Sequence, residues 1–115
     1  MTLELVVIFP VVLLLIFGAV QGAIHYHARN VAQAAAAEAV VAGSVLGGTE
    51  SGATDAAEAF IASAGDGILT GSVVRVQRTG TTITATVEGR SLNIMPGVPT
   101  PAISQTVSGT VERTG

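Results

Sequence analysis

This chain lacks several features on which common functional classes depend. It has no cysteine, which excludes disulfide frameworks, thiol catalysis and thiolate metal sites. It has no lysine either, and its five arginines are scattered through 115 residues with a formal net charge of −3. Because nucleic-acid binders need clustered basic residues to engage phosphates, we expect no nucleic-acid partner.

Charged and aromatic residues are also scarce, at 11% and 3% of the chain, whereas 49% is hydrophobic. Soluble domains usually carry about 25% charged residues. The strings G-x-S-x-G and H-E-x-x-H and the phosphate-binding P-loop string do not occur. We therefore predict a protein that is not an enzyme and has no cofactor and no small-molecule substrate.

The two histidines do not predict a metal site. His25 and His27 are two residues apart, so on a helix they point about 200° apart and cannot share an ion. Tyr26 lies between them, and an amphipathic ring suits the boundary between membrane and water. We predict that all three lie at that boundary.

An apolar run at the N-terminus has the length of a membrane span. In Leu5–Ile24 only Gln21 is polar, and a helix of this length covers about 30 Å, the thickness of the bilayer's hydrocarbon core. A secretory signal peptide would begin with basic residues and have a shorter apolar core, whereas this chain begins with an acid, Glu4. We predict a retained transmembrane helix with its span at about residues 5–24.

The helical pattern continues past the span. The stretch HYHARNVAQAAAAEAVVAG has no proline and many good helix formers, which predicts one helix over residues 3–42. Gly43 and the two glycines at 47 and 48 are expected to break it. Pro10 removes a backbone hydrogen bond and is expected to bend the helix locally.

A short amphipathic helix is predicted in TESGATDAAEAFIASAGDG. Asp55, followed three residues later by Glu58, resembles a capping pair, and Gly65 is placed to end the helix. Its apolar positions follow helical spacing: Ala57, Phe60, Ile61 and Ala64.

From Ser72 onward the period changes to two, which predicts strands. A hairpin with its turn at Thr79–Gly80 comes first, the proline-containing stretch 93–101 is a loop, and a third strand begins after it. We therefore predict an α+β fold in which a long transmembrane helix (1–42) is followed by a small domain (43–115) of one short helix and a three-stranded antiparallel sheet. The apolar strand positions are Val74, Val76, Ile83, Ala85, Val87, Ile103, Val107 and Val111.

Small residues in the long helix suggest close helix–helix packing. Gly18 and Gly22 form a small-xxx-small pair, and Ala19 and Ala23 repeat the spacing one residue along. Glycine and alanine are also simply frequent in membrane helices. The alanines at 28, 32, 35 and 36 extend a small-residue surface beyond the span and favour the packing interpretation.

Glu4 has two interpretations. As an acid at the lipid headgroup level it would be solvated and would complement the positive end of its own helix. Alternatively, it pairs with the N-terminal ammonium of a neighbouring chain inside an apolar bundle, where an unpaired carboxylate would be costly. The second arrangement would fix the register of one subunit against the next.

These residues resemble a known family. An acid in the first turn, an apolar helix containing a proline, and a small β-containing domain look like a type IV pilin-like protein. More narrowly, TLELVVIFPVVLLLIFGAVQGAIHYHARNVAQAAAAEAV resembles the TadE-like family of the Tad (Flp) pilus system. The resemblance covers roughly the first forty residues well and the remainder only in coarse pattern.

The resemblance implies a structural pilin or minor pilin that assembles into a pilus for adhesion. Its leader would be removed by a prepilin peptidase, leaving Met1 as the approximate new N-terminus and Glu4 as the family's acid. In pilins that acid is usually the fifth mature residue, whereas here it is the fourth. The implied location is the cytoplasmic membrane, crossed once with the C-terminal domain outside, and then the cell surface.

The partners implied are copies of itself or other pilins, and the inner-membrane assembly machinery. Arg29, the only basic residue near the helix, would by the positive-inside tendency favour the opposite orientation, but a removed basic leader would reverse that. The rival hypothesis is a monomeric, membrane-anchored extracytoplasmic binding module, for which the helix is only a tether.

Overall fold

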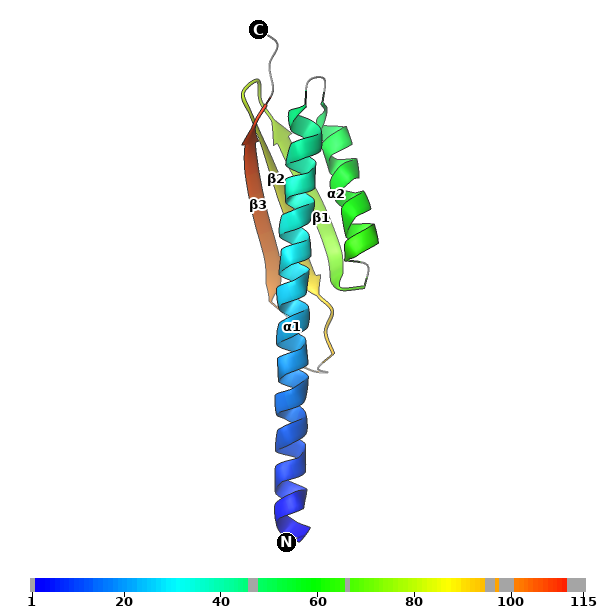
Figure 1. Cartoon of the computed structure of the whole chain (residues 1–115), viewed down its shortest axis with the longest axis vertical. Coiled ribbons are helices and arrows are strands. Elements are labelled where there is room, and N and C mark those ends of the chain that lie inside the picture. Colours follow the sequence, from blue (N-terminus) through cyan, green and yellow to red (C-terminus); the bar gives the residue numbers. More distant parts are fainter. Residues whose placement is uncertain (1, 46–47, 66, 95–96, 98–100, 112–115) are drawn as a thin grey trace.

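The computed structural model describes residues 2–45, 48–65, 67–94, 97 and 101–111. The molecule is elongated, 78 × 19 × 18 Å, and one long helix carries a sheet and a second helix along its C-terminal half (Figure 1). This confirms the predicted α+β fold. In chain order the elements are α1 (Thr2–Ser44), α2 (Glu50–Ala64), β1 (Leu69–Arg78), β2 (Thr82–Ser91) and β3 (Ala102–Thr110).

The long helix α1 has 43 residues and continues through Pro10. At the usual rise per residue it is about 65 Å long. Gly43, predicted to break the helix, lies within it, and α1 ends at the following residue. Gly43 serves packing, because a Cβ at this position would collide with the Ile83 side chain and lie 3.0 Å from the Cβ of Ala53. Its missing side chain lets the sheet and α2 approach α1 closely. Of the two later glycines predicted as helix breakers, residue 47 lies outside the described part of the chain.

The second helix begins earlier than predicted. Thr49 is its N-cap, in an extended conformation, and its hydroxyl accepts a 2.9 Å hydrogen bond from the Gly52 N–H. The predicted capping pair of Asp55 and Glu58 is therefore wrong, since both residues lie inside α2 and are exposed. The helix starts at the threonine because its hydroxyl satisfies a free N–H of the first turn.

The end of α2 and most of its apolar face agree with the prediction. Gly65 ends the helix, and its N–H donates a 2.8 Å hydrogen bond to the Ile61 carbonyl oxygen. Of the predicted apolar residues, Ala57 and Ile61 are buried and Phe60 is half-buried, whereas Ala64 is exposed. Ala53, one turn before Ala57, is also buried.

The three strands form an antiparallel sheet in chain order. Ala85 of the central strand lies opposite Val76 of β1 and Val107 of β3. The predicted turn closes with the Thr79 N–H donating to the Thr82 carbonyl oxygen at 2.8 Å. The predicted alternation is confirmed, because one face of the sheet is buried and the other is solvated. The fully buried residues of β2 are Ile83, Ala85 and Val87.

The third strand also follows the predicted pattern, with Ile103 buried and Val107 half-buried, and Val111, predicted on the same strand, is buried just after β3 ends at Thr110. Within the predicted loop 93–101, residues 95–96 and 98–100 lie outside the described part of the chain, as do 112–115.

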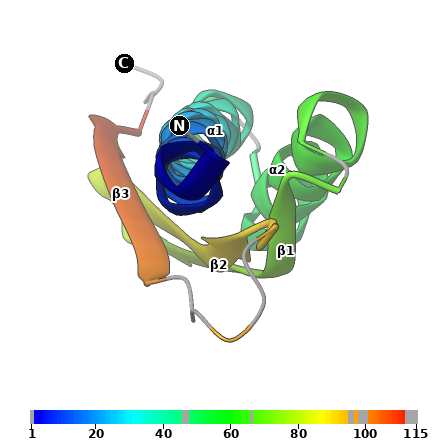
Figure 2. The same cartoon turned by 90° about the horizontal axis from the view of Figure 1, so that it is seen from below.

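The core lies between α1, α2 and the inner face of the sheet (Figure 2). Viewed along the long axis, α1 lies over the inner face of the sheet, with α2 beside it near β1. The alanines expected to extend a surface for other helices are instead buried inside this chain. Their small side chains let the sheet and α2 pack close to α1. The fully buried alanines of α1 are Ala28, Ala32, Ala35, Ala36 and Ala39.

The core thus takes residues from both sides of the proposed boundary between residues 42 and 43. The division of the chain into domains 1–42 and 43–115 stays a prediction. Residues 28–44 of α1 pack with α2 and the three strands as one body, which we call the outer body.

Candidate functional site

The most prominent surface is the apolar half of α1 that projects beyond the outer body (Figure 1). Every residue from Leu3 to Val20 is exposed, including large side chains such as Leu3, at 80%, and Phe9, at 63%. The helix is long and apolar enough to cross a membrane. At about 1.5 Å per residue this exposed stretch is about 27 Å long, close to the hydrocarbon thickness of about 30 Å. Burying such a surface away from water is strongly favourable.

The start of this helix holds the predicted acid. Glu4 is exposed in the first turn of α1, where the helix dipole favours a negative charge. Among the residues that the structure describes, none forms an ion pair with Glu4. Met1, the predicted processing position, lies outside the described residues.

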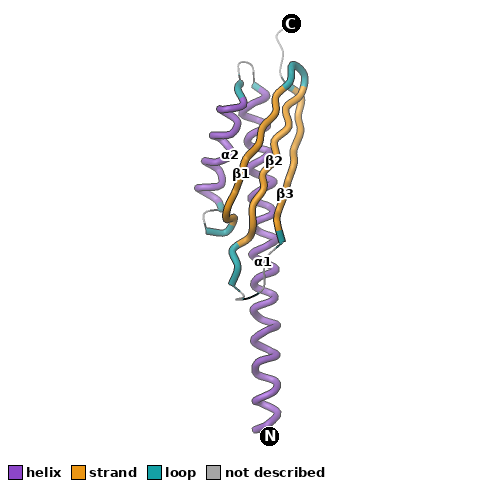
Figure 3. Tube along the Cα trace, turned by 180° about the vertical axis from the view of Figure 1, so that it is seen from behind, coloured by secondary structure: helices purple, strands orange, loops and turns teal. Residues whose placement is uncertain are grey.

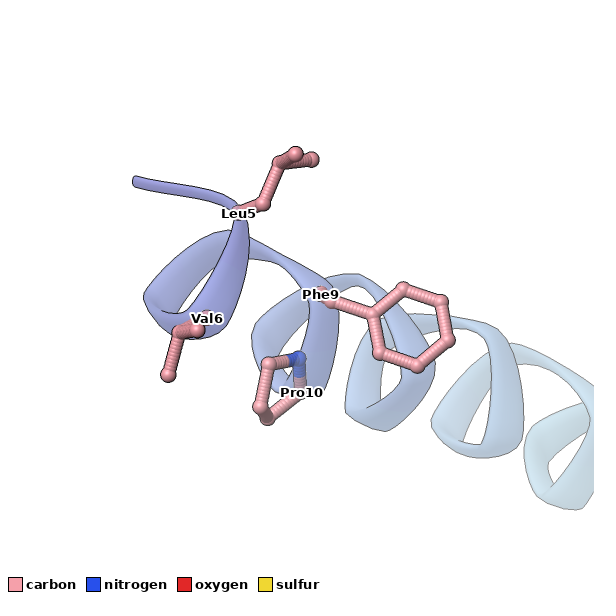
Figure 4. Close-up of a pocket in the computed structure, with 4 residues that line it drawn as sticks. All are labelled: Leu5, Val6, Phe9 and Pro10. Atoms are coloured by element: carbon pink, nitrogen blue, oxygen red, sulfur yellow. The ribbon is translucent and has the colours of Figure 1, made fainter. Parts of the chain in front are cut away.

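The first turns also contain Pro10. Leu5, Val6, Phe9 and Pro10 project outward around a shallow apolar depression on the helix surface (Figure 4). Proline has no N–H, so the carbonyl of Val6, four residues earlier, receives no helical hydrogen bond from it. Nevertheless α1 is assigned as one unbroken helix.

Gly18 and Ala19 lie in the exposed half, and Gly22 and Ala23, just beyond Gln21, are exposed as well. A Cβ added at either glycine would meet nothing within 4 Å. In this respect they differ from Gly43, whose missing side chain is required by the fold. Packing against the described residues therefore gives no reason for glycine at positions 18 and 22.

Gln21 has a role that the sequence did not predict. Its side-chain Nε2 donates a 2.9 Å hydrogen bond to the Leu92 carbonyl oxygen, and its Oε1 accepts a 2.8 Å hydrogen bond from the Ile94 N–H. These two bonds fasten the segment after β2 to α1. The signal available in the sequence was that Gln21 is the only polar side chain in a twenty-residue apolar run.

The three residues predicted at the membrane boundary lie one turn further along α1. His25 is half-buried, with Nδ1 3.5 Å from the hydroxyl oxygen of Ser91, whereas Tyr26 and His27 are exposed. They follow directly on the exposed apolar half, and their place at the membrane boundary stays a prediction.

The outer face of the sheet is polar. Arg75 and Glu88 form an exposed ion pair at 3.6 Å, and hydroxyl pairs Thr84–Ser108 and Thr86–Thr106 lie at 3.1 Å. A shallow groove runs across this face. It is lined by Arg75, Gln77, Thr84, Thr86 and Glu88.

No metal centre is present among the described residues, which contain no group of three His, Cys, Asp or Glu side chains able to hold an ion. Asp55 and Glu58 are exposed along α2, and Asp66 lies outside the described part of the chain.

Comparison with known proteins identifies the first segment. Residues 1–40 match the family model described as TadE-like protein, which confirms the resemblance over these residues. The match covers most of α1 and makes this segment, 40 of the chain's 115 residues, similar to TadE-like proteins. No curated protein and no solved structure matches the chain. The matched segment includes the exposed apolar half of α1, which is long and apolar enough to cross a membrane.

Proposed function

We propose that this chain is a structural, self-assembling subunit, a pilin or minor pilin of a Tad-type pilus that serves surface attachment. The observation that carries the proposal is the exposed apolar half of α1, Leu3–Val20, which none of the described residues covers. In the membrane, lipid covers it before assembly. In a filament, the same surface is covered by the helices of neighbouring copies or other pilins.

The small residues support helix packing over a simple tether. Glycine inside a helix costs about 1 kcal/mol relative to alanine. A Cβ at Gly18 or Gly22 would meet nothing within 4 Å, so no contact with the described residues offsets that cost. A second helix approaching closely along this face would use the missing side chains, with Ala19 and Ala23 at its margin.

Glu4 sets the register in this proposal. After a prepilin peptidase removes a leader, the new N-terminal ammonium near Met1 of one chain pairs with the Glu4 carboxylate of its neighbour. An unpaired carboxylate among apolar helices is costly, so subunits out of register are disfavoured. The assembly machinery of the inner membrane then extracts the subunit, with the outer body on the extracytoplasmic side.

The test compares Glu4→Gln with Glu38→Gln in cells that carry the pilus machinery. Glu38 is an exposed acid of the same helix within the outer body, which makes it a matched control. Both variants should reach the membrane in normal amounts, and only Glu4→Gln should lower filament incorporation several-fold. Normal filament yield from Glu4→Gln would remove Glu4 from the proposal.

Two further measurements separate this proposal from a monomeric, membrane-anchored binding module, which the polar groove on the sheet would suit. The intact mass and N-terminal peptide of the native protein should identify a processed chain beginning at or beside Met1. Extraction in mild detergent should yield polymers, or subunits that polymerise with their machinery. An unprocessed chain that remains monomeric would favour the tether.

A further inference from the structure

The segment after β2 takes a distinctive path. Beyond Ser91 the chain continues along α1 toward the exposed apolar half, past the adjacent ends of β1 and β3 (Figure 3). The Leu92 N–H donates a 2.8 Å hydrogen bond to the Ile68 carbonyl oxygen, which ties the start of the segment to the outer body. Gln21 then binds the Leu92 carbonyl and the Ile94 N–H. Residues 92–94 are therefore held between the outer body and α1.

The attachment point coincides with the end of the exposed apolar surface. Gln21 directly follows Val20, which is 44% exposed, and Leu92 is 39% exposed. The backbone of the segment is thus attached one residue beyond the last turn of this surface, and the segment has an exposed apolar side chain of its own at Leu92.

The two Gln21 hydrogen bonds suit this level of a bilayer. Polar groups near hydrocarbon are costly when they have no partner. The side-chain amide of Gln21 satisfies one carbonyl and one N–H of a non-helical backbone, and these groups satisfy the amide in return. The segment can therefore rest at the edge of the hydrocarbon without unpaired groups at these positions.

We infer that Leu92–Ile94, fastened to α1 by Gln21, is a second membrane-contacting element that rests in the interfacial region of the lipid bilayer. The helix crosses the membrane, and the segment acts as a collar that sets how deeply α1 is inserted. Its partner is the boundary between lipid headgroups and acyl chains. The inference rests on membrane anchoring and does not require filament assembly.

The chain has no cysteine, so a single engineered cysteine is the only thiol that a probe can label. We would label Leu92→Cys with an environment-sensitive NBD probe in the full chain, reconstituted in vesicles of phosphatidylethanolamine and phosphatidylglycerol. Val12→Cys in the span and Val73→Cys on the outer body are matched references, exposed at 43% and 48%.

The Leu92 probe should have its emission maximum at a shorter wavelength than the Val73 probe. Aqueous iodide should quench the Leu92 probe several-fold less than the Val73 probe. Lipids with a spin label near the headgroup should quench it more than lipids labelled near the chain end, whereas the Val12 probe should show the reverse preference. Iodide quenching equal to that at Val73 would overturn the inference.

The role of Gln21 is tested by Gln21→Ala, with Gln33→Ala, an exposed glutamine of the same helix, as control. Gln21→Ala should raise iodide quenching at Leu92 toward the Val73 level, and Gln33→Ala should leave it unchanged. An unchanged probe in Gln21→Ala would refute the collar. If circular dichroism shows that Gln21→Ala unfolds the outer body, the test rests on iodide quenching of the Leu92 probe in the chain that keeps Gln21. Glu4→Gln should not affect any of these readings, which separates this inference from the assembly proposal.

Discussion

The side chain of Arg78, at the end of β1, caps the C-terminus of α1. Its Nε donates a 2.9 Å hydrogen bond to the carbonyl oxygen of Gly43, 35 residues earlier in the chain. The last turn of α1 contains no basic residue of its own. The sheet thus supplies the positive charge that complements the negative end of the helix dipole.

Removing this contact should destabilise the outer body. We expect Arg78→Ala to lower the free energy of unfolding by about 1–3 kcal/mol, because a charge-assisted hydrogen bond to a helix end is lost. Chemical denaturation of the full chain in detergent, followed by circular dichroism, measures the change. Arg75→Ala is the control, since its exposed ion pair should contribute at most about 1 kcal/mol. Equal effects of the two variants would contradict the capping role.

Gly43→Ala should also destabilise the outer body. The new Cβ would collide with the Ile83 side chain, and such overpacking typically costs about 1–3 kcal/mol. The nearest colliding atom is the Ile83 Cδ1, so adding Ile83→Val should recover part of the loss. Unfolding curves of the single and double variants measure this, and Gly18→Ala, which has open space, should leave the body unaffected. A double variant less stable than Gly43→Ala would contradict the collision.

The start of α2 can be tested at its cap. Thr49→Ala should lower the free energy of unfolding by about 1 kcal/mol, because the Gly52 N–H loses its acceptor. Asp55→Ala, at the position where the sequence suggested a cap, should change it by less than about 0.5 kcal/mol. Thermal melts of both variants distinguish a helix start at Thr49 from one at Asp55. A larger loss of stability in Asp55→Ala than in Thr49→Ala would favour the start at Asp55.

The glycine pair tests assembly apart from folding. Gly18→Leu and Gly22→Leu should leave the unfolding free energy of the outer body unchanged, because a Cβ at either position would meet none of the described residues within 4 Å. Each should lower filament yield or cross-linking between copies several-fold, because a bulky side chain blocks the close approach of a second helix. Val12→Leu is the control for a change of volume on the same helix. Full filament yield from both glycine variants would leave the pair without an assembly role.

The elements that were predicted well are those whose signal is local. The period of two in β2 and the helix-forming stretch after Ile24 depend on neighbouring residues, and both predictions agree with the structure. The assembly residues Glu4, Pro10, Gly18 and Gly22 were also chosen from local pattern. Their role stays a prediction, because a single chain contains no interface between subunits.

The errors arose where a residue's role depends on distant partners. From the sequence alone Gly43 is interpreted as a helix breaker, whereas in the structure its missing side chain makes room for Ile83. The alanines around Ala32 form a small-residue stripe whether they face another subunit or the chain's own sheet, and only the packed core distinguishes these cases. The N-cap was misplaced because both Thr49 and Asp55 are residue types that can cap a helix.

By itself, the sequence determined the membrane-length helix, the order and type of the later elements, and the family resemblance of the first forty residues. Composition and periodicity are sufficient for these, since they record which side chains avoid water within one helix or strand. Only the tertiary structure decided which half of α1 is buried and that Gln21 binds Ile94, 73 residues away. Such contacts depend on how the backbone brings distant segments together, and a linear pattern does not specify that.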